Sequence, residues 1–534
     1  MRYFIKLPDA EDHENHVMGE AVRIRETVDD RIVKKMEKLS GQGVRKCEEM
    51  NRHLESFVIN DLFKGRRQPA KTMRRFYPTN KDIANAILRE KTRQCHSKAD
   101  QENLEHLVRK WKEKSPDDFF HYRRFQEDTS KEGTAQNILF VFQSKDQQRL
   151  LRRYGNQMCL IDATYRTTRY ALPLFFLCVR INVSYQVVAA FVTQNEDAPS
   201  IAEALRIVQQ WNPDCHPKYF MVDFDTAEMA ILEEVFSEGV VLLCDFHREK
   251  AWGEWTSKND NGSYIWKSNE KLRRWFDNVW LPEKERWCVA YRKEDFIIAV
   301  NTNNGLERQN EALKYQYLGG YRNCSFSEML TVVITRFLTD SYTKYITRNV
   351  RGSYGYRVYN DAILNFLRNR PSSVVDHVHQ RLGTASDESA ILKIEECVGQ
   401  HGTFVVKSGS SVDKSYTIKF GTETTFPTFD CDDWRRNRLP CKHICAVFLS
   451  KSEWGWERLS PLCTQNPLLS LDELCISSSP PSADCKNTER VTLYRARVPR
   501  QKTLISEKRK CRLVLMPSPP EGETRRQCSW QSVG

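Results

Sequence analysis

The sequence predicts an α/β (α+β) chain built around one mixed β-sheet with helices packed on it. From residue 138, short apolar runs rich in β-branched and aromatic residues, such as "ILFVFQ" and "PLFFLCVRIN", are separated by polar turns, as buried strands are. Helical patterns then alternate with further short apolar runs, giving the order strand, helix, strand, helix, strand. Several of these runs end in acidic residues, which directs attention to one edge of the sheet.

The totals set the limits of this reading. A chain of 534 residues has room for about two to four domains. The formal charge of +12, from 82 Lys and Arg against 70 Asp and Glu, fits a polyanionic partner without requiring one. The 17 cysteines are scattered, and no secretory signal or membrane-length apolar run occurs. We therefore expect a reducing compartment, no membrane, and cysteines that serve as core residues or metal ligands.

Two segments precede the sheet. Residues 1–27 contain "HENH", and His13 with His16 is read either as the remnant of a zinc-chelating module or, the favoured reading, as two surface histidines. Residues 28–130 are expected to be helical, with Asp29 or Asp30 as an N-cap and a glycine turn between two amphipathic helices. Such a pair fits a DNA-binding helix-turn-helix or any other helical hairpin.

The sheet is followed by helices. "APSIAEALRIVQQW" and "TAEMAILEEVF" are predicted helices on either side of the strand "KYFMVDFD". Residues 248–300 are rich in Trp and charge and are predicted to form a helical insert, after which "NTNNG" turns into a helix that carries Glu307. "TFVVKS" and "SYTIKFG" predict a β-hairpin before a cysteine–histidine cluster at 400–450. Residues 451–534 lose periodicity, gain Ser and Pro, and are expected to form a disordered basic tail.

Three acidic residues have positions suited to chemistry. Asp162 ends the first strand of the sheet proper, Asp223 ends a later strand that can lie beside it, and Glu307 lies on a helix after the sheet. Carboxylates this close would repel and raise one another's pKa, a conflict that Mg²⁺ or Mn²⁺ removes. Two such ions can activate a nucleophile and stabilise the leaving oxygen of a phosphodiester. Alternatively, each acid has an ordinary structural role, as a turn cap or a solvent-exposed helix residue. Asp225 is also as good a candidate for the second acid as Asp223.

Four segments, "DATYRTTRYALPLFFLCV", "MVDFDTAEMAILEEVF", "LLCDFHREKAW" and "TNNGLERQNEALK", together resemble the transposase domain of Mutator-like elements (MULE) over about residues 135–345. The resemblance implies a ribonuclease H-like fold with a helical insert and a catalytic, metal-binding D, D, E triad. Asp162, Asp223 and Glu307 match that triad. The other matching positions of the family motifs are Thr164, Cys244, His247, Thr302, Asn303, Asn304 and Asn310.

Cys244 and His247 match a C-x-x-H that follows the strand after the second acid. With only two soft ligands in view, structural support or a substrate contact ranks above zinc binding for this pair. Asn310, which also matches the family motif, is expected to be a supporting residue of this site.

"FDCDDWRRNRLPCKHICAVF" resembles a SWIM-type zinc finger, whose pattern is C-x-C, a spacer, then C-x-H. Cys431, Cys441 and His443 match as zinc ligands, whereas Phe429 stands where the first cysteine belongs. Water, Asp430 or Cys445 are candidates for the open position, and a packed hairpin without metal is the alternative. The basic spacer with Trp434 is read as a phosphate-contacting surface or as a solvated loop.

These readings combine into a transposon-derived, DNA-binding nuclear protein that would cut and join DNA strands with a two-metal site. Between Arg490 and Arg512 the tail holds nine Lys or Arg against one Glu, which fits nuclear targeting or a solubilising role. The rivals are a catalytically silent domesticated transposase that acts as a DNA-bound regulator, and an adaptor that binds proteins through the finger. The oligomeric state is left open, and an oligomer is compatible with the sequence.

Overall fold

The computed structural model describes residues 20–477, and the chain divides between Leu107 and Val108 into two compact units. Within that span the description leaves out residues 43, 45, 95–96, 98, 127–135, 260–269, 289–290, 292–299, 320–323, 354, 357–362, 387–392 and 408–413. The His13–His16 pair and the basic stretch after residue 477 therefore lie outside the described residues. No helix in the described part of the chain is long and apolar enough to cross a bilayer.

The first unit is helical. Its helices are α1 (Glu20–Arg25), α2 (Asp30–Gly41), α3 (Cys47–Phe57, continued as a π-helix over Val58–Leu62), α4 (Asn80–Gln94) and the start of α5 (Asp100–Lys114). The carboxylate of Asp29 accepts a bond from the backbone N–H of Arg31 at 3.0 Å, so Asp29 is the N-cap of α2. Ile32, Met36 and Leu54 are buried in the core between these helices, which confirms the amphipathic pattern.

The second unit contains a seven-stranded mixed sheet in the order β1-β2-β5-β4-β3-β6-β7. Its strands are β1 (Phe119–Arg123), β2 (Leu139–Gln143), β3 (Met158–Thr164), β4 (Leu174–Arg180), β5 (Tyr185–Thr193), β6 (Tyr219–Val222) and β7 (Val240–Leu243). The pairs β3–β6 and β6–β7 are parallel and the others are antiparallel. The mixed sheet and the position of β6 beside β3 are as the sequence predicts.

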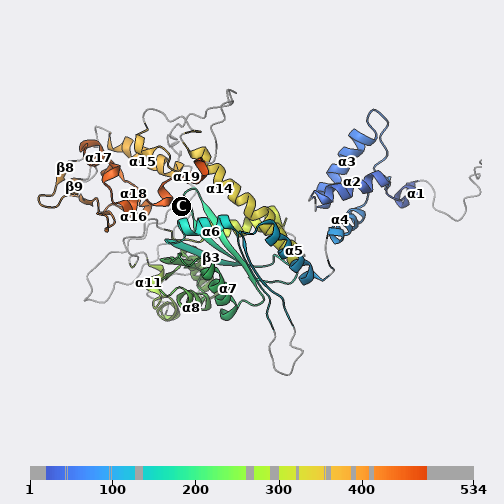
Figure 1. The fold of residues 1–534 in the computed structure, drawn as a ribbon, viewed down its shortest axis with the longest axis horizontal. Helices are drawn as coiled ribbons and strands as arrows, with labels where there is room; N and C mark the ends of the chain where they lie inside the picture. Colours follow the sequence, from blue (N-terminus) through green and yellow to red (C-terminus); the bar gives the residue numbers. More distant parts are fainter. Residues whose placement is uncertain are drawn as a thin grey trace, which may run out of the picture. The chain divides into compact units, whose positions relative to one another are not determined.

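Helices enclose this sheet. They are α6 (Lys145–Tyr154), α7 (Ala198–Trp211), α8 (Thr226–Val235), α12 (Asn304–Ala312, continued as a π-helix over Leu313–Tyr317), α13 (Phe326–Val332) and α14 (Leu338–Gly352). Figure 1 shows α7 and α8 on one side of the sheet and α14 on the other. Strands β3, β4 and β5 have near-continuous apolar sequences, and almost every one of their side chains is buried.

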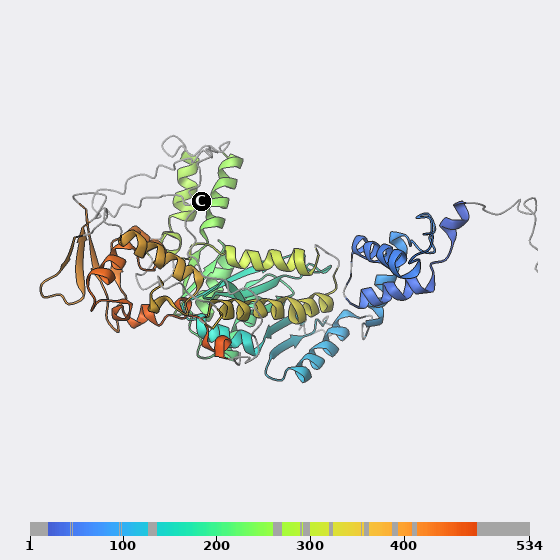
Figure 2. The same cartoon turned by 90° about the horizontal axis from the view of Figure 1, so that it is seen from above.

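The Trp-rich insert after β7 is helical where it is described. It contains α9 (Asp245–Asn259), α10 (Glu270–Trp275), a π-helix over Phe276–Trp280 and α11 (Lys284–Trp287), and Figure 2 shows α9 and α10 extending away from the sheet. Its tryptophans enclose Arg248, whose guanidinium lies 4.6 Å from the Trp252 ring and 5.2 Å from the Trp287 ring. The aromatic residues thus form the base of the insert.

A smaller module follows α14. It comprises α15 (Ser372–Ala385), a four-stranded sheet of β8 (Ile394–Glu396), β9 (Thr403–Lys407), β10 (Ser415–Lys419) and β11 (Thr428–Phe429), then α16 (Asp432–Asn437) and α17 (Lys442–Ser450). Strands β9 and β10 form the predicted antiparallel hairpin. The module has its own apolar core, separate from that of the large sheet.

Two expectations about boundaries are wrong. The ribonuclease H-like sheet does not begin near residue 135, because β1, inside the segment expected to be helical, pairs with β2 through Phe120↔Phe142. Residues 451–477 are not disordered: they form short helices at Trp456–Arg458, Pro461–Thr464, Pro467–Leu469 and Glu473–Ser477. Single apolar anchors such as Leu459, 1% exposed, hold this segment, and anchors at irregular spacing leave no periodic signal in the sequence.

Candidate active site and zinc finger

Asp162 and Asp223 lie side by side at one edge of the large sheet. Strands β3 and β6 run parallel with Leu160 opposite Met221, and this register continued by two residues places Asp162 beside Asp223. Parallel strands present their carboxyl ends at the same edge, where ligands bind in open α/β sheets. The order of the strands, rather than a local motif, brings the first two acids together.

Glu307 reaches the same edge from α12, which packs across β3, β4 and β5. The helix lies close to β5 because Gly305 has no side chain: a Cβ atom there would lie 2.2 Å from the Tyr185 ring. Asn310, three residues after Glu307 and on the same helical face, donates from Nδ2 to Oδ2 of Asp162 at 3.0 Å. The glycine therefore allows the approach that positions Glu307 and Asn310.

His247 lies between the second and third acids. Its Nδ1 is 2.6 Å from Oδ1 of Asp223, and its Nε2 is 3.0 Å from Oε1 of Glu307. Burial disfavours the charged imidazolium, but the Asp223 carboxylate and the Cys244 sulfur outweigh it and raise the pKa of His247 to about 10. A positively charged ring thus joins two of the predicted triad acids.

Cys244 is linked to Asp223 through Asn303. Its thiol lies 3.1 Å from Oδ1 of Asn303 and accepts from the Asn303 backbone N–H at 3.3 Å, while Nδ2 of Asn303 donates to Oδ1 of Asp223 at 2.9 Å. Asp223, Cys244 and His247 also present donor atoms within 4.8 Å of one another. The contacts agree with the reading of Cys244 as a supporting residue, because they link it through Asn303 to the second acid.

Burial and crowding change the acidity of the site. Burial, together with the neighbouring charges of Asp223 and Glu307, raises the pKa of Asp162 to about 7. Asp223 and Glu307 keep 35% and 33% of their side-chain surface exposed, so a substrate can reach them. Burial first, and the charges of the neighbouring acids second, thus disfavour ionisation of Asp162.

Asp225 has a different role from Asp223. Its Oδ1 accepts from the backbone N–H groups of Ala227 and Glu228 at 2.9 and 3.0 Å, which makes it the N-cap of α8. The structure therefore separates two acids that the sequence alone could not rank.

Two cations near Asp162 were not singled out from the sequence. Lys314, half-buried, follows Glu307 by seven residues, or two helical turns, and so shares its face. Burial lowers the pKa of Lys314, while the charge of Asp162 raises it and that of Arg166 lowers it further. Arg166, four residues after Asp162, has a left-handed backbone with φ of 61°. The spacing from Glu307 to Lys314 is the signal that could have identified the lysine.

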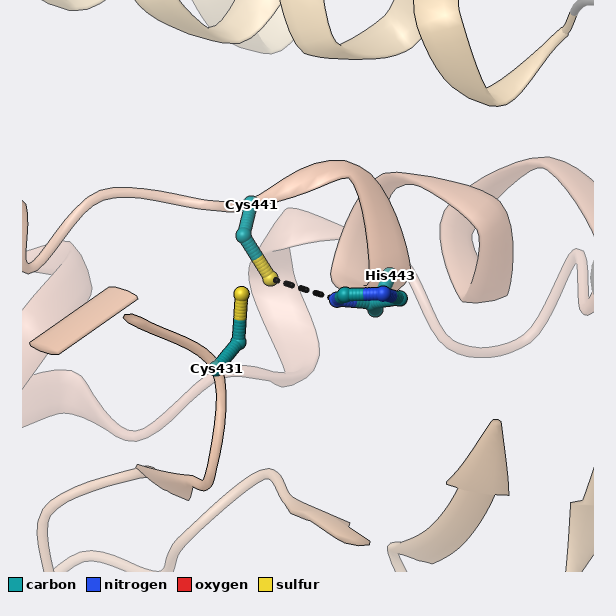
Figure 3. A group of neighbouring side chains, drawn as sticks. All are labelled: Cys431, Cys441 and His443. Atoms are coloured by element: carbon teal, nitrogen blue, oxygen red, sulfur yellow. Dashed lines mark hydrogen bonds between the residues drawn. The ribbon is translucent and has the colours of Figure 1, made fainter. Parts of the chain in front are cut away.

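The cysteine–histidine cluster is brought together in the smaller module. Cys431 precedes α16, Cys441 precedes α17, and His443 lies in the first turn of α17. One donor atom from each lies within 4.8 Å of the other two, and Figure 3 shows both thiols and the imidazole facing a common point. The Cys441 sulfur is 3.7 Å from Nδ1 of His443. Two thiols and one imidazole, all buried, fit a zinc ion.

The described residues bring no fourth His, Cys, Asp or Glu into that group. Asp430 lies 3.4 Å from Arg435, and Cys445 is fully buried in the core of the module. Phe429, at the position of the missing ligand, packs edge-to-face on Trp434 with ring centroids 4.3 Å apart. Phe429 is therefore a core residue at the position where the finger pattern has a zinc ligand.

Trp434 does not contact phosphate, as one reading of the spacer had it. Its side chain is 0% exposed and packs between Phe426 and Phe429, while Arg435 and Arg436 of the same short helix are exposed. An amphipathic helix with one aromatic anchor explains the result: α16 covers the finger core with Trp434 and presents its arginines to solvent.

Three models of known families match parts of the chain. A model described as the RNaseH-like domain of zinc finger SWIM domain-containing protein 1/3 matches residues 121–242, which include Asp162 and Asp223. A SWIM zinc finger model matches residues 430–452, and one described as amyotrophic lateral sclerosis 2 chromosomal region candidate gene 8 matches residues 1–94. No curated protein matches the chain. The chain therefore contains a ribonuclease H-like domain followed by a SWIM zinc finger, a combination typical of a protein that acts on nucleic acid.

Proposed function

We propose that the chain is a transposon-derived protein, related to Mutator-like transposases, that binds DNA and cuts and joins its strands. The observation that carries the proposal is the meeting of Asp162, Asp223 and Glu307 at one sheet edge, with His247 between two of them. Carboxylates from parallel strand ends and a crossing helix are the donor set that suits Mg²⁺ or Mn²⁺. Such ions would activate the attacking oxygen and stabilise the leaving oxygen of a phosphodiester.

The chain's own residues would then have distinct tasks. Asn310 and Asn303 hold Asp162 and Asp223 in fixed orientations through their amides. Lys314 and Arg166, beside Asp162, supply positive charge for the phosphates that flank the cleaved bond. His247, in contact with Asp223 and Glu307, keeps the two acids paired before substrate arrives. In this proposal the side chains accelerate the reaction by positioning the substrate and by electrostatic stabilisation, and no side chain acts as a nucleophile.

A second candidate is a catalytically silent regulator that binds DNA in the nucleus. The contact of His247 with both Asp223 and Glu307 favours it, because an imidazolium already neutralises the acids that a metal would need. A third candidate is an adaptor that binds proteins through the SWIM finger. It is favoured by Phe429, which stands where the finger pattern has its first cysteine ligand.

The deciding experiment incubates the full chain with DNA that carries the terminal repeats of the parent element, in Mg²⁺ or Mn²⁺. We expect strand cleavage and transfer that Asp162→Asn abolishes. Asp225→Asn is the matched control, because an asparagine can still cap α8 and the side-chain bonds of Asp225 run to Ala227 and Glu228, with only its backbone N–H bonded to Asp223. Specific binding that Asp162→Asn leaves unchanged, with no cleavage by any variant, would replace the enzyme by the regulator.

A further inference from the structure

A cavity of about 750 Å³, lined mainly by charged and amide-bearing residues, lies between the zinc finger and the loop that leads into the candidate active site. One wall is Asn301, two residues before Asn303, and its backbone carbonyl accepts from the N–H of Asp245 at 2.8 Å. The opposite wall includes Arg381 of α15, Cys431 and Arg436 at α16, and Lys442 of α17. The cavity thus lies against Cys431 of the finger and against Asn301, two residues before the Asn303 that bonds to Asp223.

The charges in this cavity are unequal. Arg381 is committed to Asp433, which it reaches at 2.6 and 3.2 Å. Asp433 is therefore neutralised within the module, and Asn437 donates to it as well, at 2.8 Å. Arg436 and Lys442, in contrast, make no ion pair or hydrogen bond through their side chains with any residue the structure describes. Among the remaining charges two cations outnumber the single acid, Asp432.

We propose that this cavity holds the phosphodiester backbone of a nucleic-acid strand, with Arg436 and Lys442 each contacting a phosphate. Unpaired cations that line a cavity beside a site for phosphodiester chemistry are suited to position a strand by its backbone. Asn301 lies next to the residues that orient Asp223, so a strand in the cavity continues toward the acids. The inference rests on the proposed nucleic-acid function and assigns the finger a task within it.

The zinc ligand Cys431 lines the same cavity. Binding of zinc by Cys431, Cys441 and His443 would fix the start of α16 relative to the start of α17. These are the two helices that carry Arg436 and Lys442. The metal therefore has a structural role in this inference: it sets the spacing of the two cations, and the nucleic acid contacts the protein rather than the ion.

The test measures the affinity of the full chain for fluorescein-labelled single-stranded DNA, duplex DNA and RNA over a range of salt concentrations. For Arg436→Gln combined with Lys442→Gln we expect binding about tenfold weaker, with a salt dependence lower by about two phosphate contacts. Arg435→Gln is the matched control: Arg435 is exposed on the same helix, lies beside Asp430 and does not line the cavity. It should leave both the affinity and the salt dependence nearly unchanged.

The outcomes separate the two proposals. If the wild-type chain binds no nucleic acid, the proposed function fails and this inference fails with it. If the wild type binds and the double variant keeps its affinity and salt dependence, only the cavity assignment is overturned. A polyglutamate peptide that binds the wild type better than any nucleic acid, and loses binding in the double variant, would assign the cavity to an acidic protein partner and overturn the inference. Circular dichroism and zinc content of the double variant establish that it is folded.

Discussion

At the scale of single residues, His247 is the side chain that contacts two of the three acids of the candidate active site. It contacts Asp223 and Glu307 at 2.6 and 3.0 Å, and no other cation is seen between these two acids among the described residues. Its raised pKa means that the ring is charged at neutral pH. In the protein without divalent metal, the imidazolium therefore offsets the repulsion between two carboxylates.

Replacing His247 with Asn should reveal this compensation. Without metal, we expect His247→Asn to lose about 1–3 kcal/mol of stability, because two acids are left facing each other without a positive partner. Excess Mg²⁺ should restore more of the melting temperature in the variant than it adds to the wild type. Thermal denaturation with and without Mg²⁺ measures both effects, and His401→Asn, an exposed histidine, is the control. Equal responses of variant and wild type would show that His247 does not substitute for a cation.

Phe429 is a residue at which one substitution tests the proposed zinc site. Phe429→Cys would place a thiol at the position where the SWIM pattern has its first ligand, two residues before Cys431 of the Cys431, Cys441 and His443 group. We expect zinc to bind at least about tenfold more tightly, because a tetrahedral protein site would then be complete. Competition with a chromophoric chelator gives the affinity.

The matched control is Phe426→Cys. Phe426 also packs on Trp434, with ring centroids 6.0 Å apart, so this variant loses comparable packing without gaining a ligand at the right position. Both variants should destabilise the metal-free module, since each removes a buried ring. Zinc binding that is no tighter in Phe429→Cys than in Phe426→Cys would place the fourth coordination position away from residue 429.

At the scale of elements, the approach of α12 to β5 depends on one glycine. A side chain at Gly305 would collide with the Tyr185 ring, and the helix carries both Glu307 and Asn310. We expect Gly305→Ala to displace the helix, lower stability by about 1–3 kcal/mol and abolish any cleavage. Adding Tyr185→Ala should recover much of both losses, because it removes the ring that the new methyl group meets. A double variant no better than Gly305→Ala in melting temperature would refute this account.

The segment after the finger is a second element with a specific anchor. Asp472, 1% exposed, accepts from Nη1 of Arg149 and from the hydroxyl of Tyr345, each at 2.6 Å. Leu468 belongs to the core of the large sheet, and its neighbour Leu469 belongs to the core of the finger module. This segment therefore ties the two cores together, with Asp472 as its polar attachment.

The anchor should be sensitive to acid. Burial opposes ionisation of Asp472, but the bonds from Tyr345 and Arg149 outweigh it and hold the pKa of this carboxyl below its usual value near 4. Its contribution is fully present above the unfolded-state pKa and disappears as the pH falls through the lower, folded-state pKa. We expect Asp472→Asn to cost about 1–3 kcal/mol at pH 7 and to flatten the loss of stability below pH 4. Denaturant titrations at several pH values measure this, and parallel curves for wild type and variant would contradict it.

At the scale of the whole molecule, the sequence was most informative where pattern and topology coincide. The runs around Asp162 and Asp223 predicted two strands that can lie side by side, and β3 and β6 are adjacent and run parallel. The two neighbouring apolar runs "TFVVKS" and "SYTIKFG" likewise predicted the antiparallel hairpin that β9 and β10 form. The grouping of Cys431, Cys441 and His443 was implied by the resemblance of this segment to a SWIM-type finger, and the structure brings their donor atoms together.

The sequence was least informative where a contact depends on distant parts of the chain. Strand β1 joins the sheet only by pairing with β2, across a segment that interrupts any local pattern. Asp472 is buried because Arg149, more than three hundred residues earlier, meets it. The place of His247 between Asp223 and Glu307 likewise follows from the packing of three separate elements. Such contacts form only in the assembled fold, and the helix and strand propensities of the local sequence do not indicate them.

The separation of the two cores leads to the last prediction. The candidate zinc ligands Cys431 and Cys441 belong to the core that also contains Phe404 and Ile418, and the large sheet has a core of its own. Because the energy of zinc binding is folding energy for a module this small, removing zinc with a chelator should unfold the finger module first. Hydrogen exchange in β9 and β10 should then accelerate by orders of magnitude, while β3, β4 and β5 keep their protection. Restoring zinc should restore protection in β9 and β10. If the strands of the large sheet lost protection together with those of the finger, the two cores would form one cooperative unit, joined through Leu468 and Leu469.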